Sequence, residues 1–341
     1  MKSLQPIEIV GGGLAGLSLG LALRQQDIPV TLFEAGSYPR HRVCGEFITG
    51  LGEDTITRLG LAPFLNTALT HREVAWFNHN RVMQIQPLPQ PALGLSRHQL
   101  DAQLADAFVT SGGTLHAQTR ITGNAKPPGR LFASGRRRGN SDWLGLKIHA
   151  YDLPLERDLE LHLGDHCYVG LTRVDRTGCV NICGLFRGQK ISATRADLLL
   201  TYLRVSGLAG LAERITNATL DPDSFCAVAA VKFDRQVAPK GRMQLGDACA
   251  MIPPFTGNGM AMAFQSAECA IDPILAYARG ETDWDTAGNR LHSALHNRFR
   301  RRLSSANLLH PFLTSAASQR LLSVLSRARL LPLQPLYSVL H

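Results

Sequence analysis

Residues 7–35 read IEIVGGGLAGLSLGLALRQQDIPVTLFEA, and this stretch decides the fold. Its first four residues are suited to a short buried strand. Leucines then recur at helical spacing, which predicts an α-helix over residues 14–24. Residues 28–33 have the composition of a second strand. The order strand, helix, strand predicts a parallel βαβ unit at the start of the chain.

Three glycines separate the first strand from the helix with the spacing G-x-G-x-x-G. Gly11 permits the tight turn, Gly13 lets the backbone approach a pyrophosphate, and Gly16 lets the helix pack close to the sheet. The helix N-terminus, at Leu14 and Ala15, offers unpaired N–H groups to phosphates. The stretch therefore predicts a dinucleotide-binding turn.

Glu34 ends the second strand about 20 residues beyond the glycines, where a carboxylate accepts hydrogen bonds from both hydroxyls of a ribose. A carboxylate at this position disfavours a 2′-phosphate, so we do not expect NADP at this site. A secretory signal peptide is also disfavoured, because several glycines interrupt the apolar run and no convincing cleavage site follows.

The composition is that of a globular protein with two domains, or one domain with a large insertion. The chain has 341 residues, of which 45% are hydrophobic and 18% are charged. No apolar run approaches the roughly 18 residues of a transmembrane helix. The net charge of +9 is concentrated in arginine clusters such as residues 136–138 and 298–302. No aromatic residues interleave with these clusters and no nucleic-acid motif occurs, so we expect no nucleic-acid partner.

The cysteines favour a reducing compartment. Their number, seven, is odd and no C-x-x-C occurs, so neither a disulfide framework nor a zinc site is supported. We therefore expect a cytoplasmic protein without a bound metal.

The rest of the chain predicts further elements. PLPQP at residues 87–91 is expected to close a hairpin, and the helix starting near residue 260 is expected to kink or break near Pro273. Helices are expected at residues 52–64, between Ser96 and Gly112, and at residues 194–204, 260–278, 286–307 and 311–331. Antiparallel strands are expected at residues 74–77, 81–85, 144–150, 159–163, 168–174, 179–186 and 226–233.

Three more motifs accompany the glycine-rich turn: YPRHRVCGE at residues 38–46, LSRHQLDAQL at 95–104 and LGDACAMIPPFTGNGMAMAFQSAE at 245–268. Together they resemble the flavoproteins of the para-hydroxybenzoate hydroxylase fold. Within that fold the sequence is most similar to the geranylgeranyl reductase-like branch, whose members have P-R-x-x-x-C-G and a G-D-A loop with Pro and Gly. The resemblance extends over residues 1–275.

This resemblance implies an α/β protein: a Rossmann-type FAD-binding domain with an inserted antiparallel-sheet substrate domain and a helical C-terminus. The FAD-binding domain is expected to be discontinuous, and the boundaries follow from the motifs. It would comprise residues 1–70, 95–142 and 235–275, with the substrate domain at 71–94 and 143–234 and C-terminal helices at 276–341.

The resemblance also implies the cofactor contacts. Arg97 would reach the phosphates or adenosine, and Asp247 would bind the ribityl chain. The helix beginning at Gly259 would stabilise negative charge on the reduced flavin ring. The expected contacts are Gly11, Gly13, Leu14, Ala15, Gly16, Glu34, Arg42, Cys44, Arg97, Gly246, Asp247, Pro254, Gly257, Asn258, Gly259 and Met260.

Cys44 is the expected catalytic residue, placed near the flavin on the substrate side. It would be a proton donor, a wall of the site or simply a buried residue, and Arg40 and Arg42 beside it in sequence favour its thiolate. Lys147 and His149 share one face of their strand, which is either the cavity face or the solvent face.

Some positions depart from the wider fold. Residues 246–250 read GDACA where many hydroxylases have G-D-A-A-H, and residues 133–136 read ASGR in place of G-A-D-G. The W-x-W-x-I-P motif of flavin halogenases is absent, which disfavours halogenation.

We therefore predict an FAD-dependent oxidoreductase, in the first place a monooxygenase that hydroxylates a hydrophobic small molecule such as a phenolic lipid, polyketide or isoprenoid. The alternative is a reductase that saturates carbon–carbon double bonds of a prenyl-type substrate. A third hypothesis is a non-enzymatic prenyl-binding protein similar to the Rab GDP-dissociation inhibitors.

Two partners remain to be named. Because no second dinucleotide fingerprint exists, NAD(P)H would bind only transiently as reductant. The basic C-terminal helices either make peripheral contact with an anionic membrane or pack as a cap over the FAD-binding domain.

Overall fold

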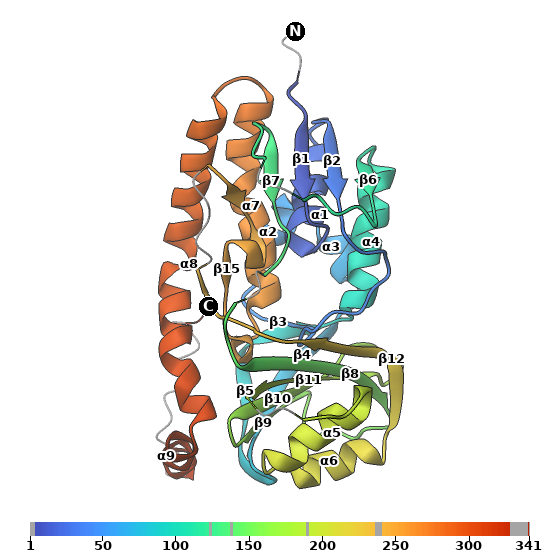
Figure 1. The fold of residues 1–341 in the computed structure, drawn as a ribbon, viewed down its shortest axis with the longest axis vertical. Coiled ribbons are helices and arrows are strands. Elements are labelled where there is room, and N and C mark those ends of the chain that lie inside the picture. Colours follow the sequence, from blue (N-terminus) through green and yellow to red (C-terminus); the bar gives the residue numbers. More distant parts are fainter. Residues whose placement is uncertain are drawn as a thin grey trace.

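The computed structural model describes residues 4–122, 125–136, 139–188, 191–235, 241–327 and 340. It contains two main sheets, one above the other in Figure 1, and a long C-terminal helix, α8 (Trp284–Thr314), that runs along the side of both. The predicted fold class is confirmed: a Rossmann-type α/β unit, an inserted sheet and a helical C-terminus. Among the described residues, no helix is long and apolar enough to cross a membrane.

The first sheet is the predicted parallel one. Its order is β14-β7-β1-β2-β6, and helix α1 (Leu14–Arg24) connects β1 to β2. Every residue of α1 from Leu14 to Leu23 is buried, because the helix packs against the sheet and against α4 (Arg97–Thr110) and α7 (Gly259–Ala278). The strands are β14 (Met243–Gln244), β7 (Arg130–Phe132), β1 (Ile7–Val10), β2 (Val30–Phe33) and β6 (Thr114–His116).

The second sheet has eight strands in the order β12-β8-β11-β10-β9-β4-β5-β3. Its neighbours pair antiparallel except β4 and β9, which are parallel, so the sheet is mixed. The strands are β12 (Thr219–Val228), β8 (Trp143–Tyr151), β11 (Val180–Arg187), β10 (Cys167–Arg173), β9 (Leu159–Gly164), β4 (Leu69–Asn78), β5 (Arg81–Gly94) and β3 (Phe47–Ile48).

The two faces of this sheet have different neighbours. Helices α5 (Arg195–Val205) and α6 (Ala209–Thr216) cover one face and form a core with Leu146 and Ile148 of β8. Because side chains alternate along a strand, Lys147 and His149 point to the other face, toward the Rossmann sheet. This answers the question that the sequence left open: both side chains point inward and are buried.

The remaining elements connect the two sheets or close the chain. A short two-stranded sheet joins β13 and β15, and 3₁₀ turns lie at Gly246–Ala248 and Pro254–Thr256. The helices and strands that complete the fold are α2 (Glu53–Arg58), α3 (Ala62–Leu65), β13 (Asp234–Arg235), β15 (Ala250–Met251), α8 (Trp284–Thr314) and α9 (Ala316–Arg327).

Several predicted boundaries were wrong. The helix expected over residues 52–64 is two helices, because Gly60 adopts φ +63 and ends the first of them. The strand expected at 226–233 lies at Thr219–Val228, and helix α6 was not predicted. PLPQP, expected to close a hairpin, belongs to β5. The strand bulges there, because pairing with β4 stops at Pro87 and resumes at Ala92.

Proline did not end the C-terminal helices. Helix α7 continues through Pro273 and α8 continues through Pro311, although proline removes one backbone hydrogen bond from each. Ile271 and Ile274 are buried on either side of Pro273. Tertiary packing therefore outweighs the local preference.

Candidate active site

A cavity of about 1330 Å³ extends from the glycine-rich turn to the inner face of the large sheet. It is larger than the roughly 300–1,000 Å³ of a pocket for one small ligand, so it has room for a cofactor and a substrate together. All the predicted cofactor contacts line it except Gly16 and Asn258, which lie beneath its wall.

The glycines of the first turn serve different needs. Gly11 has φ +113, and a Cβ there would overlap the Ala133 carbonyl. A Cβ on Gly16 would overlap the carbonyl of Gly11. A Cβ on Gly13, in contrast, would have nothing within 4 Å, since Gly13 borders the cavity. Gly11 and Gly16 are thus needed by the fold, whereas Gly13 leaves space for a ligand.

Both helices that begin at the cavity do so without a capping side chain among the described residues. Gly13, which precedes α1, has no side chain, and the side chain of Asn258, which precedes α7, accepts no hydrogen bond from the first turn. The first turn of each helix also lacks acidic residues. Their N–H groups are available to anionic groups of a ligand in the cavity, which suits a pyrophosphate at one helix and an anionic ring at the other.

Glu34 is fixed at the end of β2. It is 6% exposed, and its two oxygens accept hydrogen bonds from the backbone N–H of Gly12 (2.7 Å) and of Gly36 (2.8 Å). The Arg40 guanidinium lies 3.1 Å from one oxygen. A carboxylate has about four acceptor positions, so the carboxylate retains capacity for a ribose hydroxyl.

Asp101 organises the arginines beside the cavity. It is 1% exposed and accepts two hydrogen bonds from Arg97 (2.7 and 2.8 Å) and one from Nε of Arg42 (2.9 Å). Nη2 of Arg42 also lies 3.9 Å from the Glu34 carboxylate, so Arg42 connects the two carboxylates. Arg42 lines the cavity, where a guanidinium is suited to an oxygen of a bound phosphate.

Asn258 and Asp247 lie differently with respect to the cavity. Asn258 is fully buried and holds the loop before α7, because it accepts from the Thr49 hydroxyl (3.1 Å) and donates to the Leu340 carbonyl (2.7 Å). Asp247 faces the cavity, and burial raises the pKa of its carboxyl although Arg97 and Arg136 oppose this effect.

The expectation that arginines favour the Cys44 thiolate was wrong. Burial raises the pKa of the Cys44 thiol, and the opposing effect of Arg97 is smaller. The two arginines close to it in sequence are engaged elsewhere, Arg40 with Glu34 and Arg42 with Asp101. Cys44 therefore lines the cavity as a neutral thiol.

The far end of the cavity is apolar, and no motif in the sequence predicts it. Trp76, Leu161, Tyr168 and Leu313 line this apolar lobe together with Phe233. Among the described residues, the indole N–H of Trp76 has no hydrogen-bond partner, whereas the Tyr168 hydroxyl lies beside the backbone of Phe255. The lobe is thus suited to a largely hydrophobic molecule.

A polar cluster lies on the same face of the sheet, where residues 38–46 pack against β8. Lys147 is fully buried, and its Nζ lies 3.0 Å from Nδ1 of His41 and 3.9 Å from Glu46. The His149 ring lies 2.6 Å from the other oxygen of Glu46. His41 stacks on His98 with 4.2 Å between the ring centres. Glu46, His41 and His98 were not predicted as site residues, because each meets its partner across more than fifty positions of sequence.

The comparisons with known proteins agree with this geometry. Residues 9–45 match the model of an NAD(P)-binding Rossmann-like domain. A stretch of 126 residues is 23% identical to the menaquinone reductase of Mycolicibacterium smegmatis, and it covers 36% of this chain and 31% of that reductase.

Two solved structures match over nearly the whole length. HpxO of Klebsiella pneumoniae, complexed with FAD and uric acid, has a TM-score of 0.74 at 18% identity, covering 98% of this chain and 96% of HpxO. The p-nitrophenol 4-monooxygenase PnpA of Pseudomonas putida has a TM-score of 0.71 at 14% identity, covering 99% of both chains. This chain has an FAD-dependent monooxygenase-like fold.

Proposed function

We propose that this protein is an FAD-dependent oxidoreductase, in the first place a monooxygenase that hydroxylates a hydrophobic small molecule. The observation that carries the proposal is one continuous cavity that begins at two uncapped helix N-termini and ends in an apolar lobe. Bound FAD would supply the electrons that activate oxygen for transfer to the substrate.

The residues of the chain would hold the cofactor and exclude water. Gly13 and the N-terminus of α1 would bind the pyrophosphate, assisted by the Arg42 side chain on the cavity wall, and Glu34 would bind the ribose. The loop ending at Gly259 and the N-terminus of α7 would stabilise negative charge on the ring. Leu161 and the other side chains of the apolar lobe would keep the reacting end of the substrate away from water.

The visible spectrum of the purified protein tests the proposal. We expect an oxidised-flavin spectrum, either as purified or after loading with FAD, and bleaching by NADH or NADPH as a transient reductant. A colourless protein that cannot be loaded with FAD would overturn the proposal and favour the non-enzymatic prenyl-binding alternative.

A reductase of the geranylgeranyl reductase-like branch is the second candidate. It is favoured by P-R-x-x-x-C-G at residues 39–45 and by the partial match to a menaquinone reductase. Cys44, as a neutral thiol on the cavity wall, still has a proton to donate to carbon. Turnover without oxygen decides between the two: product formed anaerobically excludes the hydroxylase.

We also propose a cytoplasmic enzyme that makes peripheral contact with membranes. Leu308, Phe312, Leu321 and Val324 on α8 and α9 are exposed, and Phe312 also lines the cavity. Exposed arginines, including Arg301, lie on the same helix as Leu308 and Phe312 and would attract anionic lipid. Co-sedimentation with two kinds of vesicle, one of phosphatidylcholine alone and one that also contains phosphatidylglycerol, tests this proposal. If the protein binds neither kind, membrane contact is excluded.

A further inference from the structure

Two strands near one edge of the large sheet bring a histidine and a carboxylate side by side. His149 of β8 pairs directly with Asp221 of β12, so their side chains lie on the same face of the sheet. The register of β12 then shifts between Asp221 and Cys226, and Ser224 holds this β-bulge. Its hydroxyl accepts from the backbone N–H of His149 (2.7 Å) and donates to the carbonyl of Asp221 (2.7 Å). Bulges of this kind are over-represented next to functional sites.

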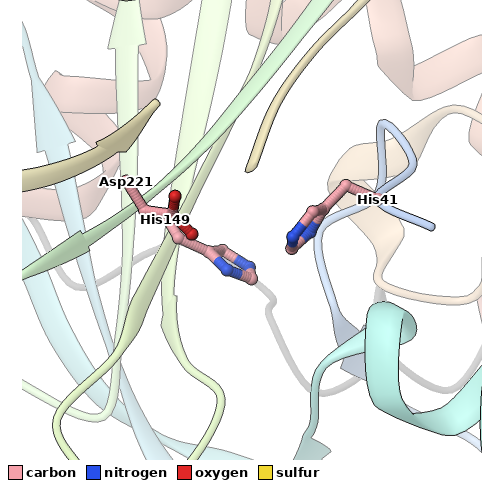
Figure 2. A group of neighbouring side chains, drawn as sticks. All are labelled: His41, His149 and Asp221. Atoms are coloured by element: carbon pink, nitrogen blue, oxygen red, sulfur yellow. The ribbon is translucent and has the colours of Figure 1, made fainter. Parts of the chain in front are cut away.

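His41 approaches this pair from the loop of residues 38–46. Its ring is nearly perpendicular to that of His149, with 5.1 Å between the ring centres. Figure 2 shows the two rings facing each other, with the Asp221 carboxylate beside His149. One ligand atom from each of the three residues lies within 4.8 Å of the other two. Tetrahedral ligands of Zn²⁺ are about 3.4 Å apart, so side-chain movements of about 1 Å would bring all three onto one ion.

Two of these side chains are held through an atom that would not bind the ion. Nε2 of His149 lies 2.6 Å from Glu46, and because a carboxylate only accepts, the ring donates there and keeps the lone pair of Nδ1. Glu46 is fully buried and has φ +53, a strained backbone conformation that is concentrated at functional sites. Oδ1 of Asp221 accepts from the backbone N–H of Asp223 (3.1 Å), so Oδ2 is the candidate ligand atom. A carboxylate behind a ligating histidine is a recurrent arrangement in metal sites, where it fixes the orientation of the ring.

The charges around the three side chains favour a cation. Lys147 is fully buried and contributes one positive charge, whereas the carboxylates of Glu46 and Asp221 contribute two negative charges. Nζ of Lys147 lies 3.0 Å from Nδ1 of His41, so Nε2 is the candidate ligand atom of that ring. An ion at Nε2 would displace the proton that the ring carries there, and metal binding to proteins generally releases protons in this way.

The other charged groups close to the cluster do not reverse this balance. Arg40 and Arg42, on the same loop as His41, pair with carboxylates that do not belong to the cluster. The exposed Asp223 adds a further negative charge beside the bulge. Imidazole and carboxylate ligands together suit Zn²⁺ and similar transition-metal ions, whereas Mg²⁺ and Ca²⁺ prefer oxygen ligands alone.

We propose that His41, His149 and Asp221 form a binding site for Zn²⁺ or a similar divalent transition-metal ion. Three protein ligands leave one position for water. The ion would join the loop of residues 38–46 to β8 and β12, and because this loop carries Arg42 and Cys44, it would fix that part of the cavity wall.

The proposed ion is independent of the proposed function, since none of its three ligands is assigned to the flavin. The expectation of a protein without a bound metal rested on the cysteines. Their spacing carries no information about ligands that come from three separate segments of the chain.

Titration with Co²⁺ tests the site, because the d–d absorption of bound Co²⁺ reports its coordination number. The purified protein, dialysed first against EDTA, is expected to bind one equivalent with the difference spectrum of a four- or five-coordinate ion, and Zn²⁺ should displace it. Binding by any of the seven cysteines would add intense sulfur-to-cobalt charge-transfer absorption, which we expect to be absent.

Two substitutions isolate the ligands. Asp221→Asn and His41→Gln are each expected to weaken Zn²⁺ binding, measured by competition with a chelator, by at least the roughly 10–100-fold that loss of an outer partner costs. Asp223→Asn, exposed and two residues from Asp221, is the matched control. It should bind like the wild type, because the backbone N–H that holds Asp221 is retained. If Asp221→Asn does not fold, His41→Gln decides the question.

Either of two results would overturn the inference. One is the lack of stoichiometric Co²⁺ and Zn²⁺ binding by the wild type. The other is wild-type affinity in either folded ligand variant, which would place the ion at other residues. Neither result bears on flavin binding. Conversely, a protein that binds the ion at this site but cannot be loaded with FAD would support this inference and refute the proposed function.

Discussion

Gly13 offers a way to remove the cofactor without disturbing the fold. Its backbone is extended, with φ −92 and ψ −171, and a Cβ built on it has nothing within 4 Å. Valine adopts this conformation readily, so Gly13→Val should change the free energy of unfolding by less than about 1 kcal/mol. The same side chain would project into the space where a pyrophosphate would lie.

Gly11→Val is the matched control. Gly11 has φ +113, which costs a non-glycine residue about 1–3 kcal/mol, and its Cβ would overlap the Ala133 carbonyl. This variant should therefore be destabilised even without cofactor. The two substitutions introduce the same side chain two residues apart, so their difference reports the role of each position and not the chemistry of valine.

Thermal unfolding with and without FAD measures both effects. At an FAD concentration 100 times the Kd, the wild type gains about 2.7 kcal/mol, a rise in Tm of roughly 4 °C for a chain of this length. Gly13→Val should unfold at the wild-type temperature without FAD and gain nothing on its addition. An unaltered FAD-dependent shift in Gly13→Val would refute the placement of the pyrophosphate at this turn.

Three further predictions concern buried ionisable groups. Asp101→Asn removes the buried charge that holds two partly buried arginines and should lower the unfolding free energy by about 3 kcal/mol in urea denaturation. Hydrogen bonds from His162 and Arg214 outweigh the opposing effect of burial and lower the pKa of Glu160 from 4.5 to about 2. A lowered carboxyl pKa stabilises the fold above pH 4.5, so this contribution should disappear between pH 4.5 and about 2, and Glu160→Gln should show a flatter profile in that window. Burial, reinforced by a nearby arginine, lowers the pKa of His310 from 6.5 to about 4. The unfolded chain then binds the proton more tightly, so His310→Phe should reduce the loss of stability between pH 6.5 and 4, measured by chemical denaturation.

The parts of the molecule that the sequence predicted are those whose contacts are local. Gly11, Gly13 and Gly16 act within one turn, and the helix and strand that follow are continuous in sequence, so spacing alone is informative. The expectation for Cys44 failed for the opposite reason. Whether Arg40 and Arg42 act on the thiol depends on where Glu34 and Asp101 lie, and pairing with these carboxylates is decided by the fold.

The polar cluster could not be predicted from spacing. His41 meets Lys147 across 106 positions of sequence, and Glu46 meets His149 across 103. Alternation along residues 144–150 places Lys147 and His149 on one face, but a strand pattern does not say which face is buried. That is decided by α5 and α6, which cover the opposite face, and α6 itself was not predicted.

The two candidate chemistries make different demands on this cavity. Saturating a carbon–carbon double bond needs a proton for carbon and an apolar surround, which the neutral Cys44 thiol and the lobe around Leu161 would supply without any buried charge. Hydroxylation of a phenol or enol is favoured when the substrate oxygen is ionised, because the ring then gives up electrons more readily. Lys147 is fully buried, but its charge is matched within the fold, because its Nζ lies 3.9 Å from the Glu46 carboxylate and donates to His41. The cavity therefore meets the demands of both chemistries, and the requirement for oxygen is what separates them.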